Sequence, residues 1–451
     1  MSLYTRLAAS VLFPFHECVK GHSTLKVLRE MEQRQWQATD QILEYQRQRL
    51  QNFIVDVANH VPYYRGVFVQ SGLEASDIQS VKDLQKLPFL TKDEIRENSD
   101  ALRSDRARDL SRFNTGGSSG EPLVFYIGKE RVSHDVAAKW RATRWWNVDI
   151  GDKEIVLWGS PIELGGQDYI KMVRDKLLRT ELLPAFEMSE LKISQFLDRI
   201  EAFKPTMLFG YPSAYALLAQ HARQQNRQMD KLGLRVAFVT SEKLYEHQRE
   251  LIEKVFGCPV ANGYGGRDAG FIAHQCPSGK LHITAEDIIV EIVDEGGKVL
   301  PSGERGEIVI THLATRDYPF IRYKTGDIGT LSEEPCACGR GLPVLEEIEG
   351  RTTDFVVAAD GTIMHGLALI YILRDLEFIN EFKIVQESTK LIRVILVSNR
   401  NLNGVEEKSI EIEFQKRLGE SVKVQLENVA KIAPERSGKK RYVVSNVDIN
   451  S

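Results

Sequence analysis

The chain has 451 residues, of which 42% are hydrophobic and 27% charged, and its formal net charge is −4. Single hydrophobic cores stop growing at roughly 250–300 residues, so a chain of this length predicts two or more domains. The charge balance excludes the basic footprint of a nucleic-acid-binding protein, and five cysteines are too few for a disulfide scaffold. These properties are typical of a globular protein of the reducing cytoplasm.

The first apolar segment, residues 7–15, is far shorter than the ~20 residues that a membrane-spanning helix needs. It also lacks a clean small-residue cleavage site, so we expect neither a transmembrane segment nor a signal peptide. We favour a buried or partner-facing helix for this segment. Loose contact with a membrane surface is the alternative.

Helical periodicity runs from Ser23 to Asn59, and Pro62 ends this helical region. From about Leu87 to Glu349, short β-branched runs alternate with helical stretches, which predicts a parallel sheet covered by helices. The run from Leu281 to Thr330 is nearly all strand and turn and predicts a β-rich subdomain. The expected strands are residues 154–158, 207–209, 236–240, 288–293 and 307–311, and the expected helices are 189–203 and 245–256.

A smaller α/β unit is expected after Arg351. Its predicted helices are residues 363–376 and 404–418, and its predicted strands are 382–386, 393–397 and 423–429. The fold class is therefore α/β, with a large N-terminal domain of mixed and parallel sheets, a β-rich subdomain and a small C-terminal α/β domain. We place the boundaries at 1–86 for a helical region packed on the body, 87–350 for the large domain and 351–451 for the small domain.

A short segment rich in glycine and hydroxyl residues follows Asn114. Glycines allow a sharp turn and close approach to a ligand, and successive N–H groups with Ser and Thr hydroxyls form an anion site. No Gly-Lys-Ser/Thr follows, so the segment is not a Walker-type loop. It predicts a loop that wraps phosphates, with a flexible surface loop as the alternative; its residues are Thr115, Gly116, Gly117, Ser118, Ser119 and Gly120.

Four residues have the spacing of a structural metal site. Cys276 and His282 are spaced C-x5-H, and Cys336 and Cys338 are spaced C-x-C, each pair beside turn-forming residues. Three thiolates and one imidazole make a tetrahedral Zn²⁺ set, so we expect structural zinc. His274 could replace His282, and four unrelated residues remain the alternative, because cysteine is often simply buried.

Five further motifs complete a recognisable pattern. In this order, together with the loop at 115–120, they resemble the adenylate-forming superfamily of acyl-CoA synthetases and their relatives. The closest likeness is to the phenylacetate–CoA ligase-like branch and, within it, to CapK-type proteins linked to capsule and exopolysaccharide biosynthesis. The likeness extends from about Tyr63 to the end of the chain; the five motifs are Tyr264–Asp268, Gly303–Thr311, Tyr323–Asp327, Gly350–Asp354 and Ser437–Arg441.

The resemblance implies that a carboxylic acid reacts with ATP to give an acyl-adenylate and pyrophosphate. Residues 115–120 would then hold the phosphates, Tyr264 would stack on adenine beside Gly265, and Asp268 would help to hold Mg²⁺. Asp327 would accept hydrogen bonds from both ribose hydroxyls, and Arg351 would contact ribose and phosphate. A core tyrosine and an ordinary turn aspartate are the structural alternatives for Tyr264 and Asp327.

The sequence departs from the family pattern at three places. Arg267 replaces the usual threonine and could reach the α-phosphate or the substrate carboxylate, or form a structural salt bridge. No lysine follows the phosphate loop, so Mg²⁺ and another basic group would have to share that duty; Lys139 and Arg141 are candidates that nothing in the sequence singles out. The usual hinge aspartate position holds Thr353, with Asp354 next, so rotation of the C-terminal domain is plausible but not assured.

Lys439 matches the lysine with which the small C-terminal domain, a mobile lid in this family, closes over the site. Lys440 is adjacent, so the register could differ by one residue, and a solvated basic cluster is the structural alternative. The acyl pocket implied by the resemblance would suit an aromatic or sugar-like acid, although ordinary core packing is the commoner use of tryptophan. Its candidates are Trp140, Trp145, Trp158, Gly210, Tyr211, Pro212 and Ser213.

Coenzyme A is the default acceptor that the resemblance implies, and an amine or a hydroxyl receiving AMP are alternatives. A homodimer would be unsurprising, since relatives often pair. A non-catalytic scaffold of a polysaccharide assembly system is the competing hypothesis. The absent loop lysine and altered hinge favour it, and the charged residues Asp268, Asp327, Arg351 and Lys439 argue against it.

Overall fold

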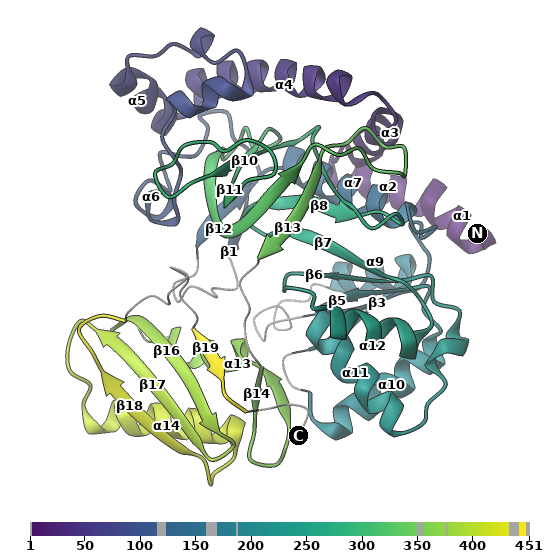
Figure 1. Cartoon of the computed structure of the whole chain (residues 1–451), viewed down its shortest axis with the longest axis vertical. Helices are drawn as coiled ribbons and strands as arrows, with labels where there is room; N and C mark the ends of the chain where they lie inside the picture. The colour runs from purple at the N-terminus through teal and green to yellow at the C-terminus, as the bar shows by residue number, and fades with distance from the viewer. Residues whose placement is uncertain are drawn as a thin grey trace.

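A single 11-stranded sheet forms the centre of the protein in its computed structural model (Figure 1). Its strand order is β10-β11-β12-β13-β9-β8-β7-β6-β5-β3-β4. Strands β4, β3, β5, β6 and β7 are parallel, and every pairing from β7 onward to β10 is antiparallel. The structure describes residues 2–114, 123–158, 169–185, 188–349, 355–374, 376, 378–432 and 442–447.

The parallel half has the strand and helix alternation that its sequence predicts. Buried β-branched and aromatic residues fill the strands, and α10, α11 and α12 form a separate core with them. The elements of this half are β3 (Glu154–Trp158), α9 (Tyr169–Leu178), β4 (Thr180–Pro184), α10 (Glu190–Phe203), β5 (Met207–Gly210), α11 (Pro212–Gln224), η4 (Met229–Leu232), β6 (Val236–Thr240), α12 (Glu246–Phe256) and β7 (Val260–Gly266).

The antiparallel half continues the same sheet, so the expected β-rich subdomain is joined to the parallel half through β7 and β8. A two-stranded sheet of β1 and β2 lies ahead of it in the chain, and α7 follows. The elements are β1 (Ser111–Asn114), β2 (Val124–Ile127), α7 (Lys129–Arg144), β8 (Gly270–Gln275), β9 (Leu281–Ile283), β10 (Ile288–Val293), β11 (Arg305–His312), β12 (Phe320–Ser332) and β13 (Val344–Glu349).

The N-terminal helices cover the antiparallel half, with α4 crossing above it in Figure 1. Ile42, Leu50 and Phe53 of α4 share one hydrophobic core with residues of β10 and β11, so this region is packed on the body. Among the described residues, no helix is both long and apolar enough to cross a membrane. The elements are α1 (Leu3–Leu7), η1 (Ala8–Leu12), α2 (Phe13–Lys20), α3 (Thr24–Arg34), α4 (Thr39–His60), α5 (Pro62–Ser71), η2 (Ala75–Asp77), η3 (Val81–Lys86) and α6 (Lys92–Glu97).

The C-terminal unit has its own four-stranded sheet, of order β18-β17-β16-β19, and its own core. It lies at the lower left in Figure 1, beside the rest of the molecule. Its elements are β14 (Phe355–Val357), β15 (Ile363–His365), α13 (Leu367–Arg374), β16 (Ile379–Ser388), β17 (Leu391–Ser398), α14 (Gly404–Leu418), β18 (Lys423–Asn428) and β19 (Val443–Ser445).

Two helix predictions need correction. The helix expected over 23–59 is interrupted between Arg34 and Thr39, because Gln35 is drawn into tertiary hydrogen bonds. Its backbone oxygen accepts from the Gly341 N–H at 3.0 Å, and its side-chain oxygen accepts from the Trp145 Nε1–H at 2.8 Å. Tertiary contacts here override the helical pattern.

The second correction concerns the helix expected over 363–376, whose first residues form a strand. Residues 363–365 are β15, which pairs antiparallel with β14, and α13 begins only at Leu367. The turn between these strands contains Asp360-Gly361, and Gly361 has φ 85°. An Asp-Gly pair is a strong hairpin signal, and here it marks the turn between β14 and β15.

Candidate functional site

Tyr264, Asp268 and Asp327 come together where β7, the β7–β8 turn and β12 meet. The Tyr264 hydroxyl donates to Asp327 Oδ2 at 3.0 Å and lies 3.5 Å from Thr325 Oγ1. The Tyr323 hydroxyl donates to Asp268 Oδ2 at 2.6 Å. Two carboxylates from motifs about 60 residues apart are therefore held by two phenols in one place.

The β7–β8 turn needs glycine to take this shape. A Cβ added at Gly265 would lie 2.3 Å from the Gly270 carbonyl oxygen, and one at Gly266 would lie 2.7 Å from Asp268 Oδ1. Such distances are shorter than van der Waals contact, so larger residues would displace the turn. Gly265 thus allows the close pairing that presents Arg267 and Asp268.

Arg267 connects this turn to the chain just before the predicted phosphate loop. Its side chain is exposed, and Nη1 donates to the Asn114 carbonyl oxygen at 3.4 Å. The Arg267 carbonyl in turn accepts from Nη2 of Arg131, which is 2% exposed, at 2.6 Å. Residues 115–120 themselves lie outside the described residues, as do Arg351 and Lys439.

Burial sets the protonation state of the phenol at this site. Burial, and then the negative charge of Asp327, raise the pKa of Tyr264 well above its ordinary value. The hydroxyl therefore stays protonated and can donate to the Asp327 carboxylate throughout the physiological range.

Five of the seven predicted acyl residues gather at the carboxyl ends of β3 and β5, the edge where parallel α/β sheets bind ligands. The Trp158 ring stacks on Tyr211, with centroids 4.6 Å apart. Gly210 has φ 154°, and a Cβ there would lie 2.1 Å from the Leu157 carbonyl oxygen. Pro212 begins α11, and the Ser213 hydroxyl donates to the Glu242 carboxylate.

The other two predicted tryptophans are packed elsewhere. Trp140 is 7% exposed and lies in the core between α2, α3 and α7, with its ring against Phe13. Trp145 packs edge-on against His282. The structure therefore brings Trp158, but not Trp140 or Trp145, together with Tyr211.

Lys139 and Arg141, the two basic residues proposed to supply charge at the phosphates, already form ion pairs. Lys139 Nζ lies 2.7 Å from Glu154 Oε1, and Arg141 Nη1 lies 2.6 Å from Glu286 Oε1. Both carboxylates are buried, so withdrawing either cation would leave an uncompensated charge in the interior. Neither side chain suits a role at the phosphates.

Known proteins are similar to this chain over much of its length. A model of the AMP-binding enzyme family matches residues 182–315, and a model of the CapK C-terminal domain matches residues 356–446. Protein CapK of Staphylococcus aureus is 25% identical over 418 residues, which cover 90% of each chain. Phenylacetate-coenzyme A ligase of Thermus thermophilus is 26% identical over 321 residues, 69% of this chain and 71% of the ligase.

The two family models and these relatives together support an adenylate-forming protein that is phenylacetate–CoA ligase-like and of the CapK type. Its fold is also that of a solved 2-hydroxyisobutyryl-CoA ligase in complex with 2-HIB-AMP and CoA. The TM-score is 0.66 at 22% sequence identity, with 92% of both chains covered. The same ligase in a postadenylation state gives a TM-score of 0.60.

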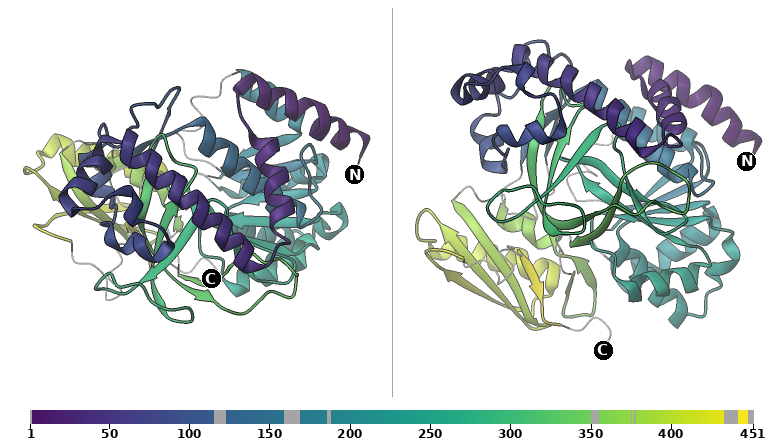
Figure 2. Two further views of the ribbon diagram at one scale, coloured as in Figure 1. Left: turned by 90° about the horizontal axis from the view of Figure 1, so that it is seen from above. Right: turned by 45° about the horizontal axis from the view of Figure 1, so that its top comes forward.

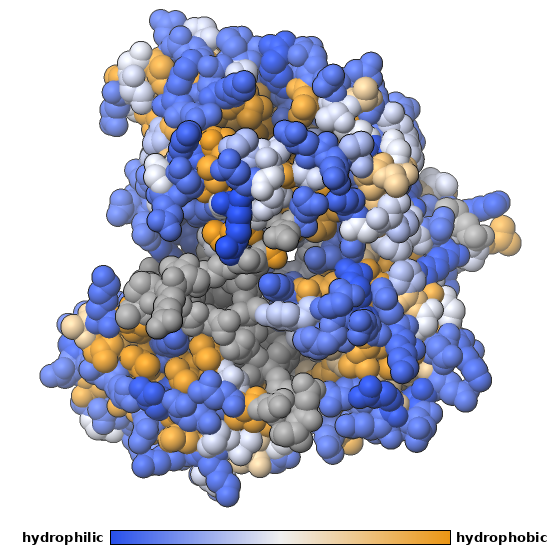
Figure 3. Space-filling view, viewed as in Figure 1, coloured by the Kyte–Doolittle hydropathy of each residue, from blue (hydrophilic) through white to orange (hydrophobic). Residues whose placement is uncertain are grey.

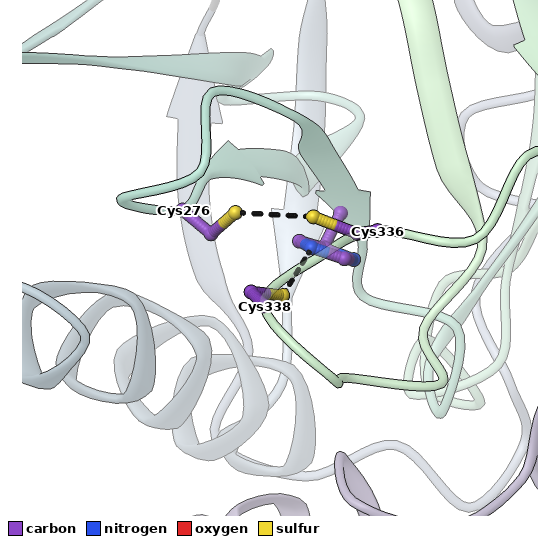
Figure 4. Close-up of side chains that lie close together, drawn as sticks. Cys276, Cys336 and Cys338 are labelled. Carbon is purple, nitrogen blue, oxygen red and sulfur yellow. Dashed lines mark hydrogen bonds between the residues drawn. The ribbon is translucent and has the colours of Figure 1, made fainter.

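A second cluster of side chains, three cysteines and one histidine, lies at the β8–β9 turn and the segment before β13 (Figure 4). Cys276 Sγ lies 3.6 Å from Cys336 Sγ, and Cys338 Sγ lies 3.2 Å from His282 Nε2. The four ligand atoms all lie within 4.8 Å of one another. His274 stacks on Phe271 instead, so His282 is the histidine of this cluster.

The chemistry of the cluster fits a zinc ion. Zn–S and Zn–N bonds of about 2.3 and 2.0 Å place tetrahedral ligands roughly 3.5–4 Å apart. His282 Nδ1 lies 3.0 Å from the Leu342 carbonyl oxygen, which fixes the tautomer with Nε2 free to bind. Burial raises the pKa of the Cys276 thiol to about 12 and lowers that of His282 to about 4. The His282 imidazole is therefore neutral. A thiolate at Cys276 would need a bound cation to stabilise its charge.

Two supporting residues of the site were not assigned roles from the sequence. Tyr323 stands inside a quoted motif, and its bond to Asp268 could have been suspected from that position. Arg131 is on α7, 136 residues before Arg267 in the sequence, and its contact with the turn depends on tertiary packing. No local pattern marks it.

Proposed function

We propose that this protein adenylates a carboxylic acid with ATP and passes the acyl group to a thiol or an amine. The observation that carries this proposal is the group formed by Tyr264, Asp268 and Asp327, with Arg267 beside the start of the predicted phosphate loop. A carboxylate is a poor acyl donor, and joining it to AMP supplies a good leaving group. Such a reaction depends on positioning and on charge stabilisation at phosphorus.

The residues fit the nucleotide as follows. Asp327 offers a carboxylate to the ribose hydroxyls, and the tethered Tyr264 ring offers a face to adenine. Asp268 would hold Mg²⁺, which prefers carboxylate oxygens bridging to phosphate, and Arg267 would face the developing negative charge. Residues 115–120, Arg351 and Lys439 are proposed for phosphates, ribose and closure of the site on the resemblance alone.

The Trp158–Tyr211 stack supports an aromatic or sugar-like acid as substrate. Pro212 and Ser213 would border it, with the Glu242 carboxylate accepting a hydrogen bond from the Ser213 hydroxyl. The likeness to Protein CapK supports a place in capsular or exopolysaccharide or O-antigen biosynthesis, with CoA or an amine as acceptor. A cytoplasmic location is proposed with it, because a CoA or polysaccharide precursor would be met there.

The domain arrangement belongs to the same proposal. Separate hydrophobic cores support a large adenylation domain over 87–350 and a C-terminal lid over 351–451. The core shared by α4 and the sheet supports a helical region, 1–86, packed on the catalytic body. The zinc ion is proposed as structural, because all four of its ligand positions are filled by protein side chains.

The deciding experiment measures pyrophosphate release with ATP and Mg²⁺ across a panel of uronic, aromatic and amino acids. Wild type is run beside Asp327→Ala and Lys439→Ala, with Asp40→Ala on the exposed start of α4 as the matched control. We expect release that needs one class of acid, falls at least about 100-fold in the two site variants, and is unchanged in the control. ATP binding without release for any acid would instead favour the non-catalytic scaffold.

A further inference from the structure

Residues 3–20 form one run of helix, α1–η1–α2, with two different faces. One face is buried against the body through Thr5, Ala8, Phe13 and Glu17. The opposite face carries five large apolar side chains that are between 48% and 85% exposed. We call this set the N-terminal apolar stripe; its residues are Leu3, Leu7, Val11, Phe15 and Val19.

The stripe is kept in line by the shape of the helix. Its residues repeat every four positions, and in a pure α-helix of 3.6 residues per turn such a repeat drifts around the axis. Residues 8–12 form a π-helical turn, which has more residues per turn and rotates the chain less at each step. This turn lies in the middle of the stripe and counters the drift, so the five side chains stay on one side.

A neighbouring helix widens the same apolar surface. The Tyr4 hydroxyl of α1 donates to the Leu177 carbonyl oxygen of α9 at 2.8 Å. Val173 and Leu177 of α9 are 40% and 44% exposed. Figure 2 shows the N-terminal helix projecting from the body in both views, and Figure 3 shows hydrophobic atoms at its projecting end. The stripe therefore lies on a projecting part of the molecule.

The exposed charges on the N-terminal helix are of one sign, and on α9 the one acidic residue, Asp175, is paired with Arg174. Arg6 and Lys20 are exposed on the same helix, and Lys176 is exposed on α9. Glu17 is the single acidic residue between Ser2 and Gly21, and it is turned inward, where its carboxylate accepts from the Thr24 hydroxyl. An apolar stripe flanked by exposed cations fits a surface that is apolar inside and negatively charged outside.

We propose that this face binds the surface of a phospholipid bilayer that contains anionic lipids, with the helix lying in the plane of the interface. Interfacial helices combine an apolar face that enters the acyl boundary with Lys and Arg at headgroup level. A second copy of the chain is the weaker occupant, because pairing two such faces would bring their cations together without an exposed acid from either helix. The proposal is independent of the adenylation chemistry.

The test is co-sedimentation of the full chain with two kinds of vesicle, pure phosphatidylcholine and a mixture with about 30% phosphatidylglycerol. We expect the chain to bind the mixed vesicles and this binding to weaken with added salt. Arg6→Gln and Lys20→Gln should each weaken it about fivefold. Phe15→Asp should weaken binding at least about tenfold. The matched control is Leu191→Asp on α10, whose side chain is 70% exposed and apart from the stripe.

Unfolding temperature and pyrophosphate release in solution are measured for every variant, and both should match wild type. The proposal would be overturned if Phe15→Asp and Leu191→Asp lost vesicle binding equally. It would also be overturned if wild type bound neither kind of vesicle. Light scattering would expose the other occupant: a dimer that Phe15→Asp dissociates, without vesicle binding, would assign the stripe to a second copy.

Discussion

At the scale of single residues, the site depends on hydroxyl groups that hold carboxylates in place. The Tyr264 hydroxyl reaches both Asp327 and Thr325, and Thr325 Oγ1 also donates to the Ile308 carbonyl oxygen at 2.8 Å. Asp327 therefore has a fixed orientation before any nucleotide is present. Preorganised groups need no rearrangement when charge or ligand arrives.

Tyr264→Phe should weaken ATP binding while leaving the aromatic face intact. A hydrogen bond to a charged group contributes about 1.5–3 kcal/mol, so we expect the KM for ATP to rise roughly 10- to 100-fold with a smaller change in kcat. Steady-state pyrophosphate release measures both constants. Tyr245→Phe, on an exposed tyrosine at the start of α12, is the control. An unchanged KM would show that the tether to Asp327 has no role.

His282 and His274 provide a matched pair for the zinc site. Both are buried, but only His282 lies with the three cysteines. We expect His282→Gln to lower the zinc content of purified protein well below one equivalent and to reduce the unfolding temperature by about 5 °C or more. His274→Gln should keep its zinc, as measured by metal analysis with thiol titration. Zinc retained in both variants would contradict the assignment.

At the scale of elements, α7 links the site to the buried side of the sheet. Arg131 on this helix donates to the Arg267 carbonyl, lies 3.3 Å from Asp135, and has its guanidinium near the Phe125 and Phe320 rings. Among the described residues, these contacts involve neither Asp327 nor the Trp158–Tyr211 stack. Arg131 is therefore a positioning residue for the turn that carries Arg267 and Asp268.

Arg131→Met should lower kcat/KM for pyrophosphate release by about 10- to 100-fold, because small displacements of positioned groups are costly. Arg131→Lys should restore part of the loss. Arg144→Met is the control on the same helix, since Arg144 pairs with Glu32 and Asp149, away from the turn. Equal losses in the two methionine variants would mean that α7 acts only through stability.

The same helix carries a histidine whose titration should affect stability. His134 Nδ1 lies 2.7 Å from Asp287 Oδ1, and Arg49 and Glu130 also face this pair. Burial alone would lower the His134 pKa, but the charge of Asp287 raises it above the ordinary value. A raised pKa stabilises the fold below about pH 6.5, and this contribution is lost as pH rises through the folded-state pKa.

Wild type should be more stable than His134→Gln, and we expect this difference in stability to be larger at pH 6 than at pH 9. Urea unfolding midpoints at the two pH values measure the difference, and His247→Gln, whose side chain is exposed on α12, is the control. A difference that does not change with pH would contradict the role given to protonated His134.

Local sequence patterns predicted most elements but few of their partners. The strands over 154–158, 236–240 and 288–293 agree with β3, β6 and β10 residue for residue, because buried β-branched runs bounded by turns leave little ambiguity. The break at Gln35 and the displacement of Trp140 into the core depend on packing between distant segments. The motifs similarly indicated Asp268 and Asp327, but not the supporting Arg131.

At the scale of the whole molecule, the chain is built around separate cores. One core joins α4 to the antiparallel half of the sheet, a second joins α10, α11 and α12 to the parallel half, and a third lies within the C-terminal unit. The first two share one continuous sheet, whereas the third has its own. The C-terminal unit should therefore unfold as an independent cooperative unit.

Calorimetry of the full chain with two core variants tests this independence. Phe414 in the C-terminal core and Phe256 in the core of the parallel half are both fully buried, and truncating a buried phenylalanine costs about 3–5 kcal/mol. We expect two heat-absorption peaks, with Phe414→Ala lowering only one and Phe256→Ala only the other. A single peak that both variants shift would mean that the two units unfold together. Independence would leave the C-terminal unit free to move as a body against the site, which a lid over an adenylation site requires.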